Sequence, residues 1–435
     1  MSRIVFASFS LLAASAVGAC GGDPTPIVDA GVVDAPLLDG ELIDAPGATV
    51  RITVTDHGAP VADVPVYFQD ADDSLVLAAT TSSTGQAETV MAAGGSVTAL
   101  LDNGASVRTY RGVKPGDRLQ LEAGTGGTSI SFDLVFPASD VVANYPIYST
   151  CGENNAFVKQ AAGTPVTATV FLYDCPPRID FLIVADDGGG APTALYAPDV
   201  AVADGVAVTL TGSYQPTAPA TVSVSNLDTT GSVELTRALA TPRGVLWRGQ
   251  QTVDVVAGAA TATFAVPAIT AVGATTTKLY GPLSNGTVAA APTPGDYALD
   301  AATAFLPAFT TVPQFDQGTA TVTWTETAAG AAPDLAYTSL SIFSGTEKRG
   351  WSWQIVGPHA GPMLTLPVVP TDLVDVNPGP VDSVSIDYTL TAKGPGGYDA
   401  LRPVALSVSS LEALAIAHPG QLAVEESAPQ FFKRR

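Results

Sequence analysis

The chain has 435 residues, of which 41 are acidic and 19 are Lys or Arg, giving a net charge of −22. A protein of this charge repels a phosphate backbone, which argues against nucleic acid as a partner. Only 14% of the residues are charged, and Gly, Pro, Val and Thr are abundant, which favours strands and turns over helices. We therefore expect an all-β protein with tandem β-sandwich domains.

The first 19 residues have the pattern of a signal peptide. Arg3 precedes an uncharged, mostly apolar run from Ile4 to Ala19, and a membrane-spanning helix needs about 20 such residues. The run is therefore too short for a retained span, and we expect range 1–19 to be removed after export.

The tetrapeptide Val17-Gly18-Ala19-Cys20 ends this segment and resembles the lipobox of bacterial lipoproteins. The resemblance implies cleavage before Cys20, a diacylglycerol on its thiol and an acylated new amino terminus. Gly21 follows, and in such proteins a residue other than Asp at this position favours the outer membrane. The resemblance thus predicts a lipid-anchored protein of the cell envelope. The alternative is an ordinary signal peptide with a chance cysteine.

An acidic five-residue repeat follows the cysteine. Aspartate recurs at Asp29, Asp34, Asp39 and Asp44, each after two apolar residues. A period of five matches neither the 3.6 residues of a helix turn nor the alternation of a strand. We therefore predict that 20–47 is a disordered, self-repelling tether. A calcium-loading repeat is the alternative, although the Asp-x-Asp clusters of calcium loops are absent.

The first folded domain is predicted over 48–127, where Val50, Ile52 and Val54 begin a period-two pattern. The stretch from Thr55 to Phe68, with Thr84-Gly85-Gln86-Ala87 and Gly94 to Ala99, is similar to bacterial Ig-like domains of the invasin and intimin type and to carboxypeptidase-regulatory-like domains. The resemblance implies a β-sandwich without catalytic residues. Two positions depart from it: Asp63 replaces the usual glycine, and Pro65 suggests an edge strand.

A second sandwich is predicted over 128–228. Lipidation of Cys20 would leave Cys151 and Cys175, 24 positions apart, as a pair in an oxidising compartment. We therefore predict a disulfide between them, worth about 3 kcal/mol in the chain-entropy model. Two separate buried thiols are the alternative. A metal site is not expected, because the three histidines lie far from both cysteines in sequence.

A third β-rich domain is predicted over 229–310. The uncharged stretch from Val255 to Thr277 is long enough to suggest a membrane span. Its threonines, its proline at Pro267 and its alternation from Ala260 to Val266 indicate strands instead.

The last sandwich is predicted over 311–420, followed by a tail over 421–435. Trp351 and Trp353 lie two residues apart on one predicted strand. Their side chains share a face, so they could form an exposed platform on which sugar rings stack. The alternative is packing in the core, the usual environment of tryptophan.

No catalytic, metal-binding or cofactor-binding motif is present. The chain lacks Gly-x-Ser-x-Gly, His-Glu-x-x-His and phosphate-loop patterns. Two acidic loops, at 70–73 and 186–190, lack the ligand order of a calcium site and are interpreted as solvated turns. We therefore predict a non-enzyme without cofactors that presents its domains for adhesion or for protein or envelope contacts. The alternatives are a carbohydrate-binding protein that uses Trp351 and Trp353, and a hydrolase with an unrecognised acidic site.

Overall fold

The computed structural model describes residues 48–56, 58–123, 129–140, 143–151, 156–160, 164–173, 175–227, 231–241, 243–267, 269, 272–280, 283–290, 295–328, 330–370, 375–402 and 422–427. The lipobox, Cys20 and the acidic repeat lie outside these ranges, so what we expect of them stays a prediction. In the described part of the chain, no helix has the length and apolar character to cross a membrane.

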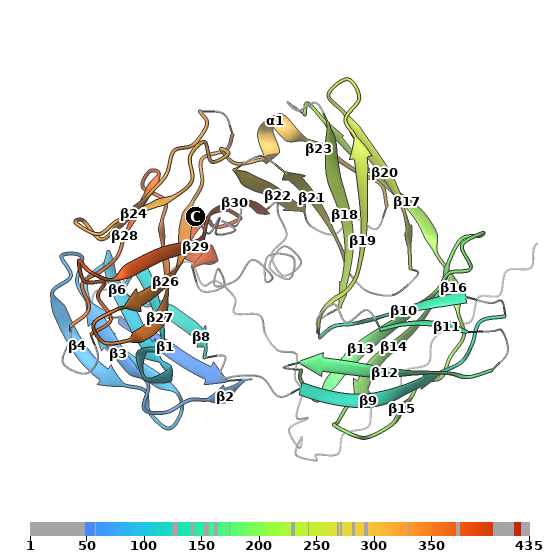
Figure 1. Cartoon of the computed structure of the whole chain (residues 1–435), viewed down its shortest axis with the longest axis horizontal. Coiled ribbons are helices and arrows are strands. Elements are labelled where there is room, and N and C mark those ends of the chain that lie inside the picture. Colours follow the sequence, from blue (N-terminus) through green and yellow to red (C-terminus); the bar gives the residue numbers. More distant parts are fainter. Residues whose placement is uncertain are drawn as a thin grey trace, which may run out of the picture. The chain divides into compact units, whose positions relative to one another are not determined.

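The protein is all-β and built of β-sandwiches, as the composition predicts (Figure 1). Four sheets have three or four strands, and a fifth has five. The first contains β2 (Ala59–Pro60), β1 (Thr49–Asp56) and β5 (Gln86–Val90), with β8 (Arg118–Glu122) parallel to β1. The first three-stranded sheet has the order β12 (Val166–Tyr173), β9 (Ser129–Phe136), β15 (Val208–Thr209), and the second has the order β20 (Ala260–Val266), β17 (Ala218–Ser225), β23 (Tyr297–Asp300). The third has the order β24 (Gln314–Asp316), β25 (Thr321–Thr323), β28 (Met363–Thr365). The five-stranded sheet has the order β11 (Ala156–Gln160), β10 (Ala143–Ser149), β13 (Arg178–Ala185), β14 (Thr193–Ala201), β16 (Gln215–Pro216).

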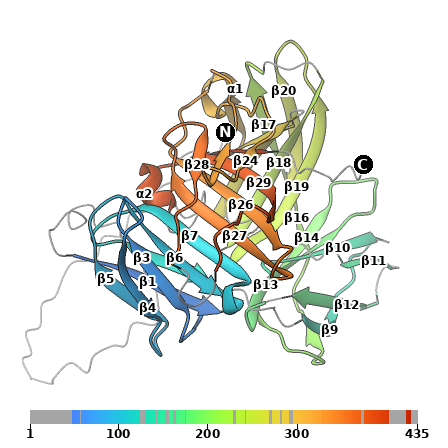
Figure 2. The same ribbon diagram turned by 60° about the vertical axis from the view of Figure 1, so that its left-hand side comes forward.

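A sixth sheet has twelve strands drawn from distant parts of the sequence. Its order is β19 (Gly244–Asp254), β18 (Ser232–Thr241), β21 (Val272–Tyr280), β22 (Ser284–Ala290), β30 (Leu422–Ser427), β29 (Ser383–Lys393), β26 (Leu335–Ser344), β27 (Arg349–Pro358), β7 (Ser106–Val113), β6 (Gly95–Leu101), β3 (Pro65–Gln69) and β4 (Leu75–Thr80). Figure 2 shows β26, β27, β7 and β6 side by side. The helices of the described residues are short: η1 (Asp102–Gly104), α1 (Ala301–Ala304) and α2 (Gly397–Leu401).

The twelve-stranded sheet joins segments that the sequence assigns to different domains. β7 pairs in parallel with β27, so Val107 lies opposite Trp353. β30 pairs with both β22 and β29. The range 421–435 is therefore more than the predicted tail, because Leu422, Ala423 and Val424 are buried in the sheet.

Two departures in the first predicted domain have local explanations. Asp63 has φ of 61°, the left-handed conformation that a glycine at this position would adopt without strain. β3 is not the edge strand that Pro65 suggested, since it pairs with β4 and β6. Pro65 is tolerated because it is the first residue of β3, where the register with β6 has not yet begun.

The strands within 128–228 enclose a core of their own. The inner faces of β9 and β12 supply Phe132, Leu134, Val170 and Leu172, which pack against side chains of the five-stranded sheet such as Phe181. In the third predicted domain, the stretch that resembles a membrane span forms β20 and part of β21. In β20, Ala260, Ala262 and Phe264 are buried and alternate with exposed residues, as the period-two pattern predicts.

Candidate functional site

The predicted tryptophan platform is wrong, because both indoles are buried in the twelve-stranded sheet. Trp351 is 5% exposed and Trp353 is fully buried. The Nε1 of Trp353 donates a hydrogen bond to Thr109 Oγ1 on β7 at 2.9 Å, and the Nε1 of Trp351 donates to the Val376 carbonyl at 3.0 Å. With their polar atoms satisfied and their rings covered, these side chains belong to the core. The carbohydrate-binding function proposed for them is therefore excluded.

A different aromatic pair with the same spacing lies on β12. Phe171 is 65% exposed and Tyr173 is 64% exposed. Val170, which precedes Phe171, and Leu172, which lies between the two rings, are buried. Alternation along a strand places residues two apart on one face, so both rings project from the outer side of the sheet. β12 is also the end strand of its sheet among the described residues.

Small polar residues surround these two rings. On the adjacent strand β9, Ser131 pairs with Phe171 and Ser129 pairs with Tyr173, so no bulky residue stands opposite either ring. One step along the face, Thr169 Oγ1 donates a hydrogen bond to Asp133 Oδ1 at 2.9 Å. The outward residues of these strands will be called the aromatic face: Thr167, Thr169, Phe171 and Tyr173 on β12, and Ser129, Ser131, Asp133 and the half-buried Val135 on β9.

The predicted disulfide is formed, and it lies beside the aromatic face. Cys151 follows β10 and Cys175 follows β12, so the bond links the two sheets of this sandwich, with a Cα–Cα distance of 5.5 Å. The carbonyl oxygen of Tyr173 lies 3.5 Å from Cys175 Sγ and 3.8 Å from Cys151 Sγ. The covalent link therefore restrains the end of β12 at the residue that carries one of the exposed rings.

The sequence contains a signal for the aromatic face that our prediction did not use. Val166, Ala168, Val170 and Leu172 form one phase of a strict alternation. Phe171 and Tyr173 fall in the other phase, with the two threonines, so the pattern predicts exposure for them. Trp351 and Trp353 instead share the phase of the buried Ile355.

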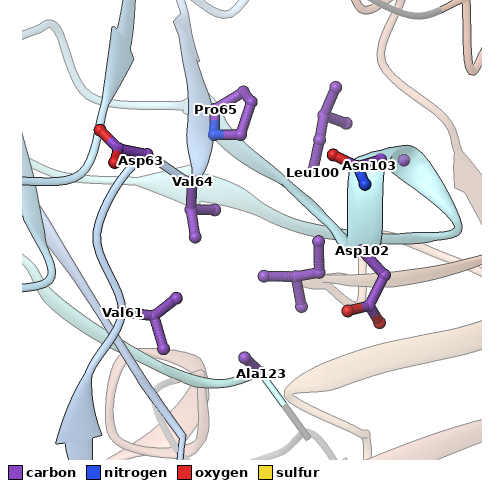
Figure 3. Close-up of a pocket in the computed structure, with 10 residues that line it drawn as sticks. Val61, Asp63, Val64, Pro65, Leu100, Asp102, Asn103 and Ala123 are labelled. Atoms are coloured by element: carbon purple, nitrogen blue, oxygen red, sulfur yellow. The ribbon is translucent and has the colours of Figure 1, made fainter. Parts of the chain in front are cut away.

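A pocket of about 440 Å³ lies in the first predicted domain (Figure 3). It is lined by the loop before β3, which carries Val61 and Asp63, and by the end of β6 with η1, which carries Leu100, Asp102 and Asn103. Figure 3 shows Asp63 and Asp102 on opposite sides, with carboxylates that do not point toward each other. The pocket does not present the two facing carboxylates that glycoside hydrolysis uses.

The two acidic loops form turns closed by their own backbone. Asp187 Oδ1 accepts hydrogen bonds from the amides of Gly189 and Gly190, which lower the pKa of Asp187. In the other loop, Asp72 Oδ1 accepts from the Ser74 amide, and hydrogen bonding by Ser74 lowers the pKa of Asp72. The described residues contain no group of three or more His, Cys, Asp or Glu placed to hold a metal ion.

A buried acidic cluster lies where β22, β30 and the loop after α1 meet. Ser284 Oγ donates a hydrogen bond to Glu425 and accepts one from the Phe309 amide. Burial raises the pKa of Glu425 to about 7. Burial also acts to raise the pKa of Glu326, but hydrogen bonds from His359 and from the indole of Trp324 outweigh it and leave that pKa lowered. Glu425 is only 3% exposed, so the carboxylate with the raised pKa is closed to substrate.

No protein-family model matches the chain, and no curated protein matches it in sequence. Similar solved structures include the Bacillus anthracis TIE protein, at 14% identity over 58% of this chain and 49% of that one, with a TM-score of 0.14. The tip fimbrial protein Mfa3 from Porphyromonas gingivalis matches at 10% identity over 38% of this chain and 78% of its own, with a TM-score of 0.16. The pilus adhesin SpaC from Lactobacillus rhamnosus GG matches at 13% identity over 72% and 44%, with a TM-score of 0.12.

This chain thus spans about half the length of the Bacillus anthracis protein, 49% of it. TM-scores this low leave the question of function to the residues of the chain itself.

Proposed function

We propose that the chain is a non-catalytic binding protein held at the bacterial cell surface by a lipid on Cys20. The observation that carries the proposal is the aromatic face, where Phe171 and Tyr173 expose their rings on a sheet that a disulfide ties to its partner sheet. Exposed aromatic residues on a rigid support are typical anchors of binding surfaces, since their ordering costs little entropy.

Other features of the sequence support an anchored role. The lipobox resemblance at Val17 to Cys20 gives an attachment point, and the acidic repeat gives a spacer between that point and the first strand at Thr49. An extended spacer over 21–48, 28 residues, reaches at most about 90 Å from the membrane surface. A binding face carried on such a spacer would remain accessible above the lipid headgroups.

The anchor is tested by fractionation of cells that express the full chain or its Cys20→Ala variant. We expect the wild-type chain in the outer-membrane fraction, with diacylglycerol on its amino-terminal peptide by mass spectrometry. The variant has no thiol to carry the diacylglycerol, so it should leave the outer-membrane fraction. Equal retention of the two chains in the outer-membrane fraction would overturn the anchoring part of the proposal.

The binding role is tested by retention of cells on coated surfaces. Cells with the wild-type chain are compared with cells carrying the double variant Phe171→Ala/Tyr173→Ala, on surfaces coated with neutral polysaccharides or with fibronectin. Phe343→Ala is a matched control, because Phe343 is another aromatic residue exposed on a strand, at 53%. We expect lower retention of the double variant on at least one surface and no change in the control. Equal retention of all three on every surface would refute the binding role.

A further inference from the structure

The aromatic face has a composition that restricts its ligand. It holds two exposed rings, Phe171 and Tyr173, spaced by two residues along one strand, or about 7 Å. Ring faces carry partial negative charge and attract the weakly positive C–H groups of a ligand that lies flat on them. A ligand with an extended row of C–H groups therefore fits both rings at once.

The neighbours of the rings supply hydrogen-bonding groups within the same small area. Asp133 is exposed on β9 and already accepts one hydrogen bond from Thr169, which fixes its orientation. A carboxylate accepts several hydrogen bonds, so Asp133 retains acceptor capacity for hydroxyl donors of a ligand. Ser129 and Ser131 add hydroxyl groups directly across from the rings.

The size and charge of this surface argue against other partners. A protein interface of standard size has an apolar core on each partner and buries about 800 Å² per side. Here the exposed apolar part is limited to two rings bordered by Thr, Ser and Asp, and the one other apolar residue in this phase, Val135, is half-buried opposite Thr167. A carboxylate beside the rings and the net charge of −22 disfavour anionic ligands. Four uncharged hydroxyl groups, from Thr167, Thr169, Ser129 and Ser131, stand against the single carboxylate of Asp133 on this face. Among the ligands that remain, these groups favour a neutral one with C–H faces and hydroxyl groups over a cation.

We infer that the aromatic face binds a neutral saccharide, whose pyranose rings stack on Phe171 and Tyr173 while its hydroxyl groups donate hydrogen bonds to Asp133. The inference rests on the proposed function, because it names the ligand class of that binding surface. The disulfide contributes to saccharide binding by restraining Tyr173, since the sulfur atoms of Cys151 and Cys175 both contact the Tyr173 carbonyl oxygen. Preorganised aromatic rings lose less entropy when a ligand binds.

The test is calorimetry on the purified full chain in detergent, titrated with neutral linear oligosaccharides: cellohexaose, laminarihexaose, mannohexaose and chitohexaose. We expect at least one to bind. Phe171→Ala and Tyr173→Ala should each weaken that binding about tenfold or more, as for other aromatic anchors. Phe171→Tyr and Tyr173→Phe preserve the rings and should retain affinity, while Phe343→Ala should leave it unchanged. Asp133→Asn should weaken binding less than loss of a ring, because an amide oxygen still accepts a hydrogen bond.

Two outcomes would overturn the saccharide assignment: binding that is insensitive to both ring substitutions, or no binding to any of the four sugars. In the second case, the cell-retention assay separates the two proposals. If Phe171→Ala/Tyr173→Ala still lowers retention on fibronectin, the aromatic face binds protein, and the saccharide inference alone is refuted. If retention is also unaffected, the proposed function fails with it. Thermal unfolding of each variant verifies that the fold is intact.

Discussion

Two aromatic pairs with identical spacing have opposite environments in this protein. Trp351 and Trp353 on β27 are buried on one face of the large sheet, in a core cluster that includes Leu364, whereas Phe171 and Tyr173 on β12 are exposed. The difference follows from phase: the tryptophans are in step with Ile355, and the β12 pair is out of step with Val170 and its buried neighbours. Residue type alone therefore predicts the function of an aromatic pair less well than its phase does.

The largest effect should come from the buried pair. We expect Trp353→Ala to lower the free energy of unfolding by about 3–5 kcal/mol, because it leaves a cavity and removes one of the two hydrogen bonds of Thr109 Oγ1. Urea unfolding monitored by circular dichroism measures this. Phe343→Ala, on the adjacent strand β26 but exposed, should change stability by about 0.5 kcal/mol or less. Similar costs for both substitutions would contradict the contrast between buried and exposed rings.

Removal of the disulfide tests how strongly it restrains β12. Replacement of Cys151 and Cys175 by Ser should cost about 3 kcal/mol in the unfolding experiment, from the greater entropy of the open chain. The double variant should also show faster hydrogen exchange at the end of β12 than in β27, because the link lies at Tyr173. Unchanged exchange at Tyr173 would mean that the sheet alone restrains the exposed pair.

Glu425 is a buried acid in the same sheet as the tryptophans, and the pH dependence of stability measures the effect of its burial. The pKa of Glu425 is about 7 in the folded state, and its unperturbed value is 4.5. Between these values Glu425 holds a proton in the folded protein that it lacks in the unfolded chain, so its contribution to stability is most favourable below pH 4.5 and is lost as the pH rises to 7. The loss is about 2–3 kcal/mol. Glu425→Gln should remove this contribution in unfolding measured from pH 4.5 to 7.5.

The smallest effect is predicted for the exposed pair. Tyr173→Ala should change the free energy of unfolding by about 0.5 kcal/mol or less, because the ring makes few contacts that folding creates. Leu172→Ala, one residue away on the buried face, should cost about 2–5 kcal/mol. A large cost at Tyr173 would show that its ring is part of the fold, and the comparison with β27 would then lose its basis.

Local features of this fold were predictable from the sequence because their causes are local. The alternation at Val50, Ile52 and Val54 marks the first strand, and Cys151 and Cys175 form the disulfide predicted for them. The aromatic face was predictable in principle, from the phase of β12. The pairing of β7 with β27 was not, since it joins strands whose residues Thr109 and Trp353 are 244 positions apart and share no motif. β30 was missed because five of its six residues are buried, which removes the alternation that identifies a strand.

The pairing of β7 with β27 also bears on how the chain reaches its native state. At about 5–20 residues per second, synthesis of the 244 residues that separate Thr109 from Trp353 takes on the order of 10–50 seconds. During that interval, the edge of β7 that later meets β27 exposes backbone groups able to pair with a strand of another molecule. Contacts of such long sequence separation form late and slow the final folding step. This edge is therefore where we expect a holding chaperone to matter most, and where aggregation would begin without one.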